Sequence, residues 1–264
     1  MRVVVSEAIQ SAARFVSAAW RVAWAILALV SGALAAAIVV PPGARRWGWL
    51  VLALVLAVSA RGALYRRAMN RGRPGPGGLQ WGPIEWRLLV VSLLSFALLG
   101  ILLLLVLVVV LCMAYAAASA GHGFDPNQVT SWAGAVDNRG RWVVSVIALA
   151  GATGLIWVAI RIALADAATV ALGKVRLLAA WPLTRDLATA ILLAAGLVGI
   201  GPALILLAVS RIAVLASPRG EGPLSWALAM VAAVSTCGLW LPLNVGLMSY
   251  FHRRADALAS TTNP

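Results

Sequence analysis

The chain has 264 residues, of which 62% are hydrophobic and only 11% are charged, and its mean hydropathy is +0.96. Soluble domains carry about 25% charged residues, so this composition excludes a soluble globular protein. The formal net charge of +13 would suit a nucleic-acid-binding protein. Apolar runs of membrane-spanning length instead favour a lipid bilayer as the partner and predict that no nucleic acid is bound.

Residues 1–21 are predicted to form an amphipathic helix that lies at the membrane surface. Its polar side chains recur every three or four residues, at Glu7, Gln10, Arg14, Ser17 and Arg21. The opposite stripe is apolar and consists of Val5, Ile9, Ala12, Val16 and Trp20. The alternative is that this segment simply continues the first membrane span.

Six apolar segments of spanning length predict an all-α polytopic transmembrane helix bundle that forms a single integral membrane domain over residues 1–264. The expected spans are residues 22–40, 47–65, 88–116, 142–165, 187–210 and 226–251. Pro41-Pro42-Gly43 ends the first span, because proline cannot continue a helix. The second span has a short apolar part, since Arg61 follows Ala60, and we expect this arginine to snorkel at the lipid boundary.

Two segments between the spans are polar yet not plain loops. Residues 66–87 form a basic stretch that glycine and proline interrupt at several points. Residues 166–186 are too polar to span a membrane and too apolar for a free loop. We expect them to form an interfacial helix on the cytoplasmic side, ended by Trp181-Pro182.

The basic residues predict the orientation of the chain. With six spans, both termini lie on one side together with 15 of the 21 basic residues, whereas the other side holds 6. The positive-inside rule therefore places both termini in the cytoplasm of a bacterial inner membrane. Arginine supplies 20 of the basic residues, and with abundant alanine this composition indicates a GC-rich bacterial genome.

Ionisable residues near the spans are the first candidates for function. Glu85 lies beside Arg87 and between two tryptophans; it can cap the third helix, and a surface pair of this kind would anchor the loop. Arg161 and Asp166 lie at the cytoplasmic end of the fourth span. The structural alternative for them is a snorkelling arginine, paired with Asp166 around the helix end. Candidate lipid contacts at the same face include Trp181 and Arg185.

The last two spans contain helix-breaking residues. Pro202 follows a run of glycines in the fifth span, which indicates either a kinked packing face, the interpretation we prefer, or a broken helix that lines a substrate site. In the sixth span Asn244 lies two residues after Pro242. Its amide can bond the backbone groups that the proline frees, or it can line a polar path.

The sequence contains no signature of a hydrolase, a metal site or a nucleotide-binding loop, and we expect neither enzymatic activity nor a cofactor. Cys112 and Cys237 are isolated and predict no disulfide framework. The favoured function is a non-catalytic scaffold or accessory protein in envelope or lipid handling. Its candidate partners are anionic lipids at the cytoplasmic face and another membrane protein. The alternatives are a small transporter or lipid-translocating protein that uses spans five and six, and an enzyme that acts on a lipid substrate.

Two segments resemble a known group of proteins. The stretch LYRRAMNRGRPGPGGLQWGPIEWRLLVV and the stretch RIALADAATVALGKVRLLAAWPLTRD are similar to parts of bacterial inner-membrane proteins with about six spans. The matching positions in the second stretch are Arg161, Ala163, Ala165, Trp181, Leu183, Thr184 and Arg185, whereas Asp186 stands where the group has glycine. The group is similar to the membrane domain fused to glycerophosphodiester phosphodiesterases. The resemblance implies a six-helix fold and does not extend to the phosphodiesterase activity.

Overall fold

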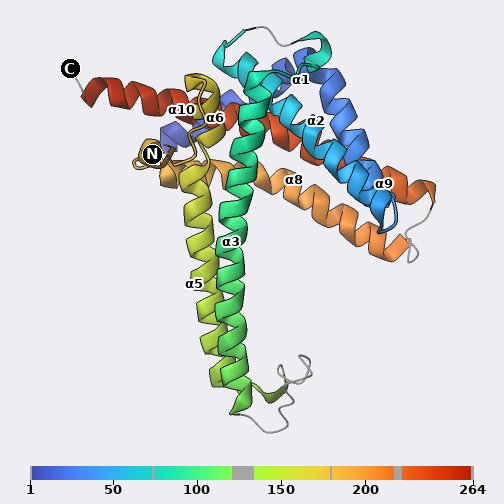
Figure 1. Ribbon diagram of the computed structural model, residues 1–264, viewed down its shortest axis with the longest axis vertical. Helices are drawn as coiled ribbons and strands as arrows, with labels where there is room; N and C mark the ends of the chain where they lie inside the picture. The colour runs from blue at the N-terminus through green and yellow to red at the C-terminus, as the bar shows by residue number, and fades with distance from the viewer. Residues whose placement is uncertain (1, 73–74, 121–133, 179, 217–221, 263–264) are drawn as a thin grey trace. The chain divides into compact units, whose positions relative to one another are not determined.

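The computed structural model describes residues 2–72, 75–120, 134–178, 180–216 and 222–262, and over these residues it contains helices and no strand (Figure 1). The elements are α1 (Arg2–Val39), α2 (Ala44–Met69), the 3₁₀ turn η1 (Pro76–Gly78), α3 (Pro83–Ser119), α5 (Asn138–Ile162), α6 (Ala165–Leu172), α7 (Ala180–Leu183), α8 (Ala188–Ala216), α9 (Pro223–Ala233), the π-helical segment η2 (Val234–Trp240) and α10 (Leu241–Thr262). Six helices in the described residues are long and apolar enough to cross a membrane. The predicted all-α, multi-pass fold is therefore confirmed.

The chain divides into two compact units. The first contains Met1–Ser92 and Ile162–Pro264, and the second contains Leu93–Arg161. Each unit is described below by itself, and the single membrane domain expected from the sequence stays a prediction.

In the first unit, α1 runs antiparallel to the last helical segments of the chain. Ala35, late in α1, is buried with Ala229 of α9. Ala12, early in α1, lies against Gly246 of α10, where a methyl group added to the glycine would come within 3.0 Å of its Cα atom. Small residues thus allow the two helices to approach closely over most of their length.

The N-terminal part of α1 is helical and amphipathic, as the sequence predicts. All five residues of the predicted polar stripe are exposed. The side chain of Glu7 accepts a hydrogen bond from the hydroxyl of Tyr250 on α10 at 2.8 Å. The helix bends at Ala23 (φ −120°, ψ 22°), close to the expected start of the first span. Its position at a membrane surface stays a prediction.

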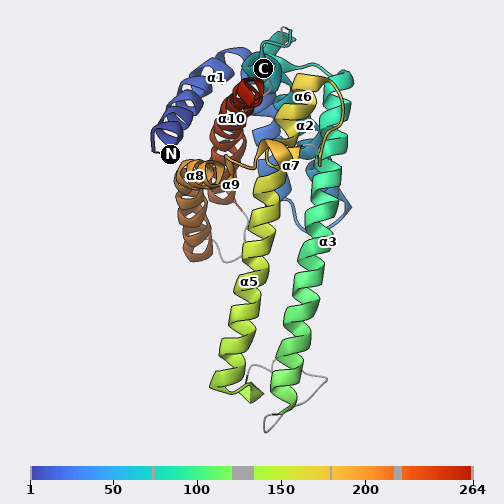
Figure 2. The same ribbon diagram turned by 90° about the vertical axis from the view of Figure 1, so that its left-hand side faces the viewer.

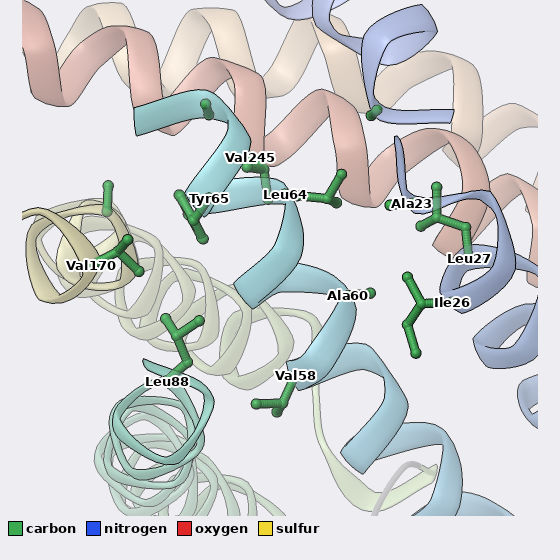
Figure 3. Close-up of a cluster of buried hydrophobic side chains, with 13 residues drawn as sticks. Ala23, Ile26, Leu27, Val58, Ala60, Leu64, Tyr65, Leu88, Val170 and Val245 are labelled. Atoms are coloured by element: carbon green, nitrogen blue, oxygen red, sulfur yellow. The ribbon is translucent and has the colours of Figure 1, made fainter. Parts of the chain in front are cut away.

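The main hydrophobic cluster of the first unit surrounds the C-terminal half of α2 (Figure 3). Leu64 and Tyr65 of α2 are at most 2% exposed, and they are buried with Ile26 of α1, Val170 of α6 and Val245 of α10. This half of α2 is therefore the hub on which the other helices of the unit pack.

The second unit is a hairpin of two antiparallel helices, formed by α3 from Leu93 onward and by α5, which lie side by side in both views (Figures 1 and 2). Gly151 of α5 lies against Val106 of α3, and Gly140 lies against Ala117. Most other apolar side chains of the hairpin are exposed, and Phe96 is 80% exposed. Such an apolar surface suits contact with lipid.

The segment after α5 differs from the prediction of an interfacial helix that ends at Trp181-Pro182. Helix α6 is only eight residues long and ends at Gly173, which adopts a left-handed conformation (φ 64°) and donates its backbone N–H to the carbonyl of Thr169. Glycine favours this type of helix end because it has no Cβ atom. Trp181 and Pro182 belong to the separate turn α7, where proline is tolerated near a helix start.

Candidate functional site

Charged side chains from α2 enter the first unit near the hydrophobic cluster. Arg61 and Arg66 are five residues apart, which places them about 140° apart around the helix. They therefore reach different neighbours, Arg61 towards α6 and Arg66 towards the start of α3. Arg66 is 4% exposed, which is rare for arginine unless its charge is paired.

Arg66 forms an ion pair with Glu85, whose residue exposure is 0%. One carboxylate oxygen of Glu85 accepts from the guanidinium group, and the other accepts the backbone N–H of Gly82 at 2.9 Å. Glu85 therefore caps the first turn of α3 and fixes that turn to α2 at the same time. The sequence predicts a surface pair of Glu85 with Arg87, and this prediction is wrong. The ionic partner of Glu85 is Arg66, and the pair is buried.

Glycine is required where α2 passes Glu85. A Cβ atom at Gly62 would collide with the carboxylate of Glu85. In contrast, a Cβ atom at Gly48 in the same helix would meet nothing within 4 Å among the described residues. The absence of a side chain at Gly62 thus lets the carboxylate reach the arginine.

Residues 75–80, in the basic stretch after α2, are folded onto this ion pair. The side-chain oxygen of Gln80 accepts the backbone N–H of Gly75 at 3.1 Å and faces the guanidinium group of Arg66 at 3.4 Å. The hydroxyl of Ser59 donates to the carbonyl of Gln80 at 3.0 Å. Gly78, with φ 82°, lies against Ile26 of α1, where a Cβ atom would come within 2.8 Å of the isoleucine side chain. The Gln80 side chain thus links this stretch to Arg66, and the glycine turn places it against α1.

Arg61 forms the second ion pair, with Asp166 at the start of α6, at 2.9 Å between Nη1 and Oδ2. The two side chains are 23% and 19% exposed, so the pair is mostly withdrawn from the surface. From the sequence we expect Arg61 to snorkel at the lipid boundary, with Arg161 as the alternative partner of Asp166. The structure instead connects Asp166 to α2, and the guanidinium carbon of Arg161 lies 4.4 Å from the ring centre of Trp157.

A third arginine connects α10 to α2. Nη1 of Arg253 donates to the carbonyl of Ala68 at 2.8 Å. The last carbonyls of a helix lack partners within the helix, and basic side chains satisfy them favourably. Asn70 closes the same helix end in the left-handed conformation (φ 53°) and donates its N–H to the carbonyl of Arg66.

The remaining residues that the sequence predicts at the cytoplasmic face take no part in these ion pairs. Arg87 is half-buried, and its Nη1 atom lies beside Gly173, within 3.4 Å of where a Cβ atom would stand. Arg185 is exposed, and Trp181 is 41% exposed. These positions leave all three side chains close to the molecular surface.

The helix breakers lie in a different part of the first unit. Pro202 is buried inside α8, and near it Gly199 packs on the ring of Trp240. Pro242 follows the π-helical segment and carries no N–H group, so the carbonyl of Gly238, four residues earlier, loses its α-helical donor.

The indole N–H of Trp20 donates to that carbonyl of Gly238 at 2.8 Å. The sequence offers Asn244, which is half-buried, either as the group that bonds the backbone freed by Pro242 or as part of a polar path. Trp20 on α1 fills the first of these roles. Because this donor belongs to another helix, it can be identified only from the assembled structure.

Sequence reasoning therefore missed three of the residues that build the site, namely Arg66, Arg61 as an ionic partner, and Trp20. The sequence does contain a signal for the two arginines. A buried cation needs an acidic partner, and the chain has only 8 acidic residues, so Glu85 and Asp166 are among few candidates. No comparable signal exists for Trp20, since its acceptor lies 218 residues away.

The arrangement is suited to holding helices together. Glu85 and Asp166 are each engaged by an arginine of α2. In the described parts of residues 61–87, 161–186 and 252–256, the exposed acidic residues are Asp186 and Asp256. The exposed basic residues there are Arg67, Arg71, Lys174, Arg176, Arg185, Arg253 and Arg254. The described residues contain no group of three or more potential metal ligands. The surface next to the buried pairs is therefore strongly basic.

Comparison of the chain with protein-family models, with curated proteins and with solved structures found no match.

Proposed function

We propose that this chain is a non-catalytic protein of a bacterial inner membrane that acts as a scaffold or accessory protein in envelope or lipid handling. In this proposal both termini lie in the cytoplasm, and the basic face contacts anionic lipids. The proposal is in keeping with the six-span group that the sequence resembles.

The observation that carries the proposal is the pairing of Glu85 and Asp166 with arginines of α2. Carboxylates that could act as general acids or bases are thereby used to hold α3 and α6 in place. The neighbouring exposed charges are mainly basic, and anionic headgroups attract such segments by about 1 kcal/mol per Lys or Arg near the surface.

The tryptophans of this face support contact with headgroups. Trp81 and Trp86 form an edge-to-face pair with ring centres 5.4 Å apart, and they are 39% and 57% exposed. Trp181 is exposed to a similar extent. Tryptophan is enriched at membrane interfaces, because its ring is apolar and its N–H is polar.

The test replaces Arg67, Arg71, Arg176 and Arg185 together with glutamine. These side chains are exposed, so the fold should persist, and the cytoplasmic set would still hold most of the basic residues. We expect less anionic lipid to co-purify with this variant than with the unmodified protein, measured by lipid extraction and mass spectrometry.

The matched control removes the same number of charges from the opposite set, by replacing Arg45, Arg46, Arg139 and Arg211 with glutamine. Anionic lipid should be retained by this control. Equal retention by both variants would show that the cytoplasmic arginines only fix topology.

A lipid-translocating protein is the second candidate. It is favoured by the interruptions in two spans, namely Pro202 within α8 and the π-helical segment before Pro242. π-Helical turns occur frequently at functional sites. Transbilayer movement of a labelled lipid in proteoliposomes would favour this candidate over a scaffold.

A further inference from the structure

An apolar cavity of about 410 Å³ lies in the first unit where α1 and α8 meet the π-helical segment. Its lining includes Trp20, Ile205, Met230, Val231, Val234 and Gly238. The volume falls within the range of about 300–1,000 Å³ that is typical of ligand pockets. The basic face and its ion pairs take no part in this cavity.

The floor of the cavity is held in place by the contact between Trp20 and Gly238. The indole N–H bonds the glycine carbonyl, and a Cβ atom at Gly238 would come within 2.7 Å of the indole ring. Two departures from regular α-helix meet here, the bend of α1 at Ala23 and the π-helical segment. The cavity is thus a built feature of the fold and does not arise from a missing side chain.

The chemistry of the lining excludes most classes of ligand. It contains no charged side chain. The N–H of Trp20 is already used, and the one hydroxyl among the described lining residues, that of Ser235, is buried without a hydrogen-bond partner. A ligand with an ionised or strongly hydrogen-bonding group would lose its hydration here and gain at most the hydrogen bond of this one hydroxyl. Only an apolar chain matches this lining.

The rim of the cavity joins the apolar outer surface of the helices that cross the membrane. Met230, Val231 and Val234 are 41–50% exposed, and Leu204, next to the lining residue Ile205, is 59% exposed. The helices that bear these residues are among those long and apolar enough to span a bilayer. Acyl chains of bilayer lipids can therefore enter directly from the surrounding membrane.

We propose that this cavity binds one acyl chain of a membrane phospholipid. The inference is independent of the proposed contact between anionic headgroups and the basic face, because the cavity recognises the chain and not the charge. Its test accordingly uses zwitterionic phosphatidylcholine, for which the basic face has no electrostatic preference.

The first measurement is native mass spectrometry of detergent-purified protein after delipidation and addition of phosphatidylcholine. The unmodified protein should retain one lipid, and Val234→Trp, which fills the cavity, should lose it. Leu204→Trp adds the same ring to the exposed surface outside the cavity and should retain the lipid. Equal retention by the two variants, or no retained lipid on the unmodified protein, would overturn the proposal.

A second measurement uses only the unmodified protein. Phosphatidylcholine with a photoactivatable group in its acyl chain is crosslinked in proteoliposomes, and the labelled peptides are mapped. We expect the label to concentrate on residues 230–239 and on Trp20. Labelling spread evenly along the exposed apolar helices would contradict a specific site, even if Val234→Trp fails to fold.

Discussion

Glu85 combines two roles that are usually separate, the cap of a helix and the partner of a buried cation. Its carboxylate accepts the N–H of Gly82 and pairs with Arg66 in a site from which solvent is excluded. Bringing two charges out of water is costly, and their attraction offsets that cost only while both are present. The pair therefore makes the contact between α2 and α3 sensitive to the loss of either partner.

We predict that Glu85→Gln destabilises the protein by about 3–5 kcal/mol, the cost of leaving a buried charge without its partner. Glutamine keeps the size of the side chain and an oxygen for the N–H of Gly82, so the lost charge is the main change. Thermal or denaturant unfolding in detergent micelles measures the effect.

The control for this prediction is Arg67→Gln, because Arg67 neighbours Arg66 in sequence but is exposed. Its effect should stay within about 0.5 kcal/mol, as for most surface substitutions. Adding Arg66→Met to Glu85→Gln should recover part of the lost stability, since the unpaired charge is then removed. A Glu85→Gln variant as stable as Arg67→Gln would show that the pair does not stabilise the fold.

At the scale of the helices, two long elements deviate from regular geometry at adjacent places. Helix α1 bends at Ala23, and the last span passes through a π-helical segment before Pro242. The hydrogen bond from Trp20 to Gly238 connects the two places. A backbone defect in one helix is thus satisfied by a side chain of the other, as is required where no water reaches the backbone.

We predict that the cost of Trp20→Phe depends on Pro242. Alone, Trp20→Phe leaves the carbonyl of Gly238 without its donor and should cost about 1–3 kcal/mol. In a Pro242→Ala background the alanine N–H can bond that carbonyl, so the same substitution should cost less. A double-mutant cycle of unfolding free energies measures this coupling.

Trp24→Phe provides the control for the cycle, because Trp24 lies one turn further along α1 and is 61% exposed. It should show no coupling to Pro242. Equal losses for Trp20→Phe in both backgrounds would indicate that the proline does not create the need for the indole donor.

At the scale of the whole molecule, the terminal helices are longer than a membrane is thick. The 38 residues of α1 extend about 57 Å at ~1.5 Å per residue, against a hydrocarbon core of about 30 Å. Its N-terminal part packs on α10, through Ala12 against Gly246 and through the bond between Glu7 and Tyr250. This packing keeps the two terminal helices side by side.

We predict that a reporter fused to the C-terminus reads as cytoplasmic and that one inserted between Gly121 and Gln128 reads as periplasmic. The insertion site falls in residues 121–133, outside the described residues, and the reason for the expected result is the excess of basic residues on the other side. Alkaline phosphatase and fluorescent-protein fusions measure the two locations. A periplasmic C-terminus would refute the six-span topology.

The sequence by itself determined the membrane class, the six spans and the amphipathic character of the N-terminal helix. Each of these follows from local information, namely the length of the apolar segments, their helical periodicity, and prolines that end a helix, such as Pro41-Pro42. Local sequence information did not predict that α6 ends at Gly173. A glycine within an apolar helical pattern can either continue the helix or end it in the left-handed conformation.

Only the tertiary structure decided which charged and polar groups meet. Arg61 with Asp166, Arg66 with Glu85, and Trp20 with the carbonyl of Gly238 join segments between 19 and 218 residues apart. Each pairing depends on which helix faces lie together, and an apolar helix surface can pack in several orientations with similar energy when lipid and protein neighbours are equally apolar. The polar partners are fixed by the assembled bundle, where a buried charge or a freed carbonyl must find its complement within reach.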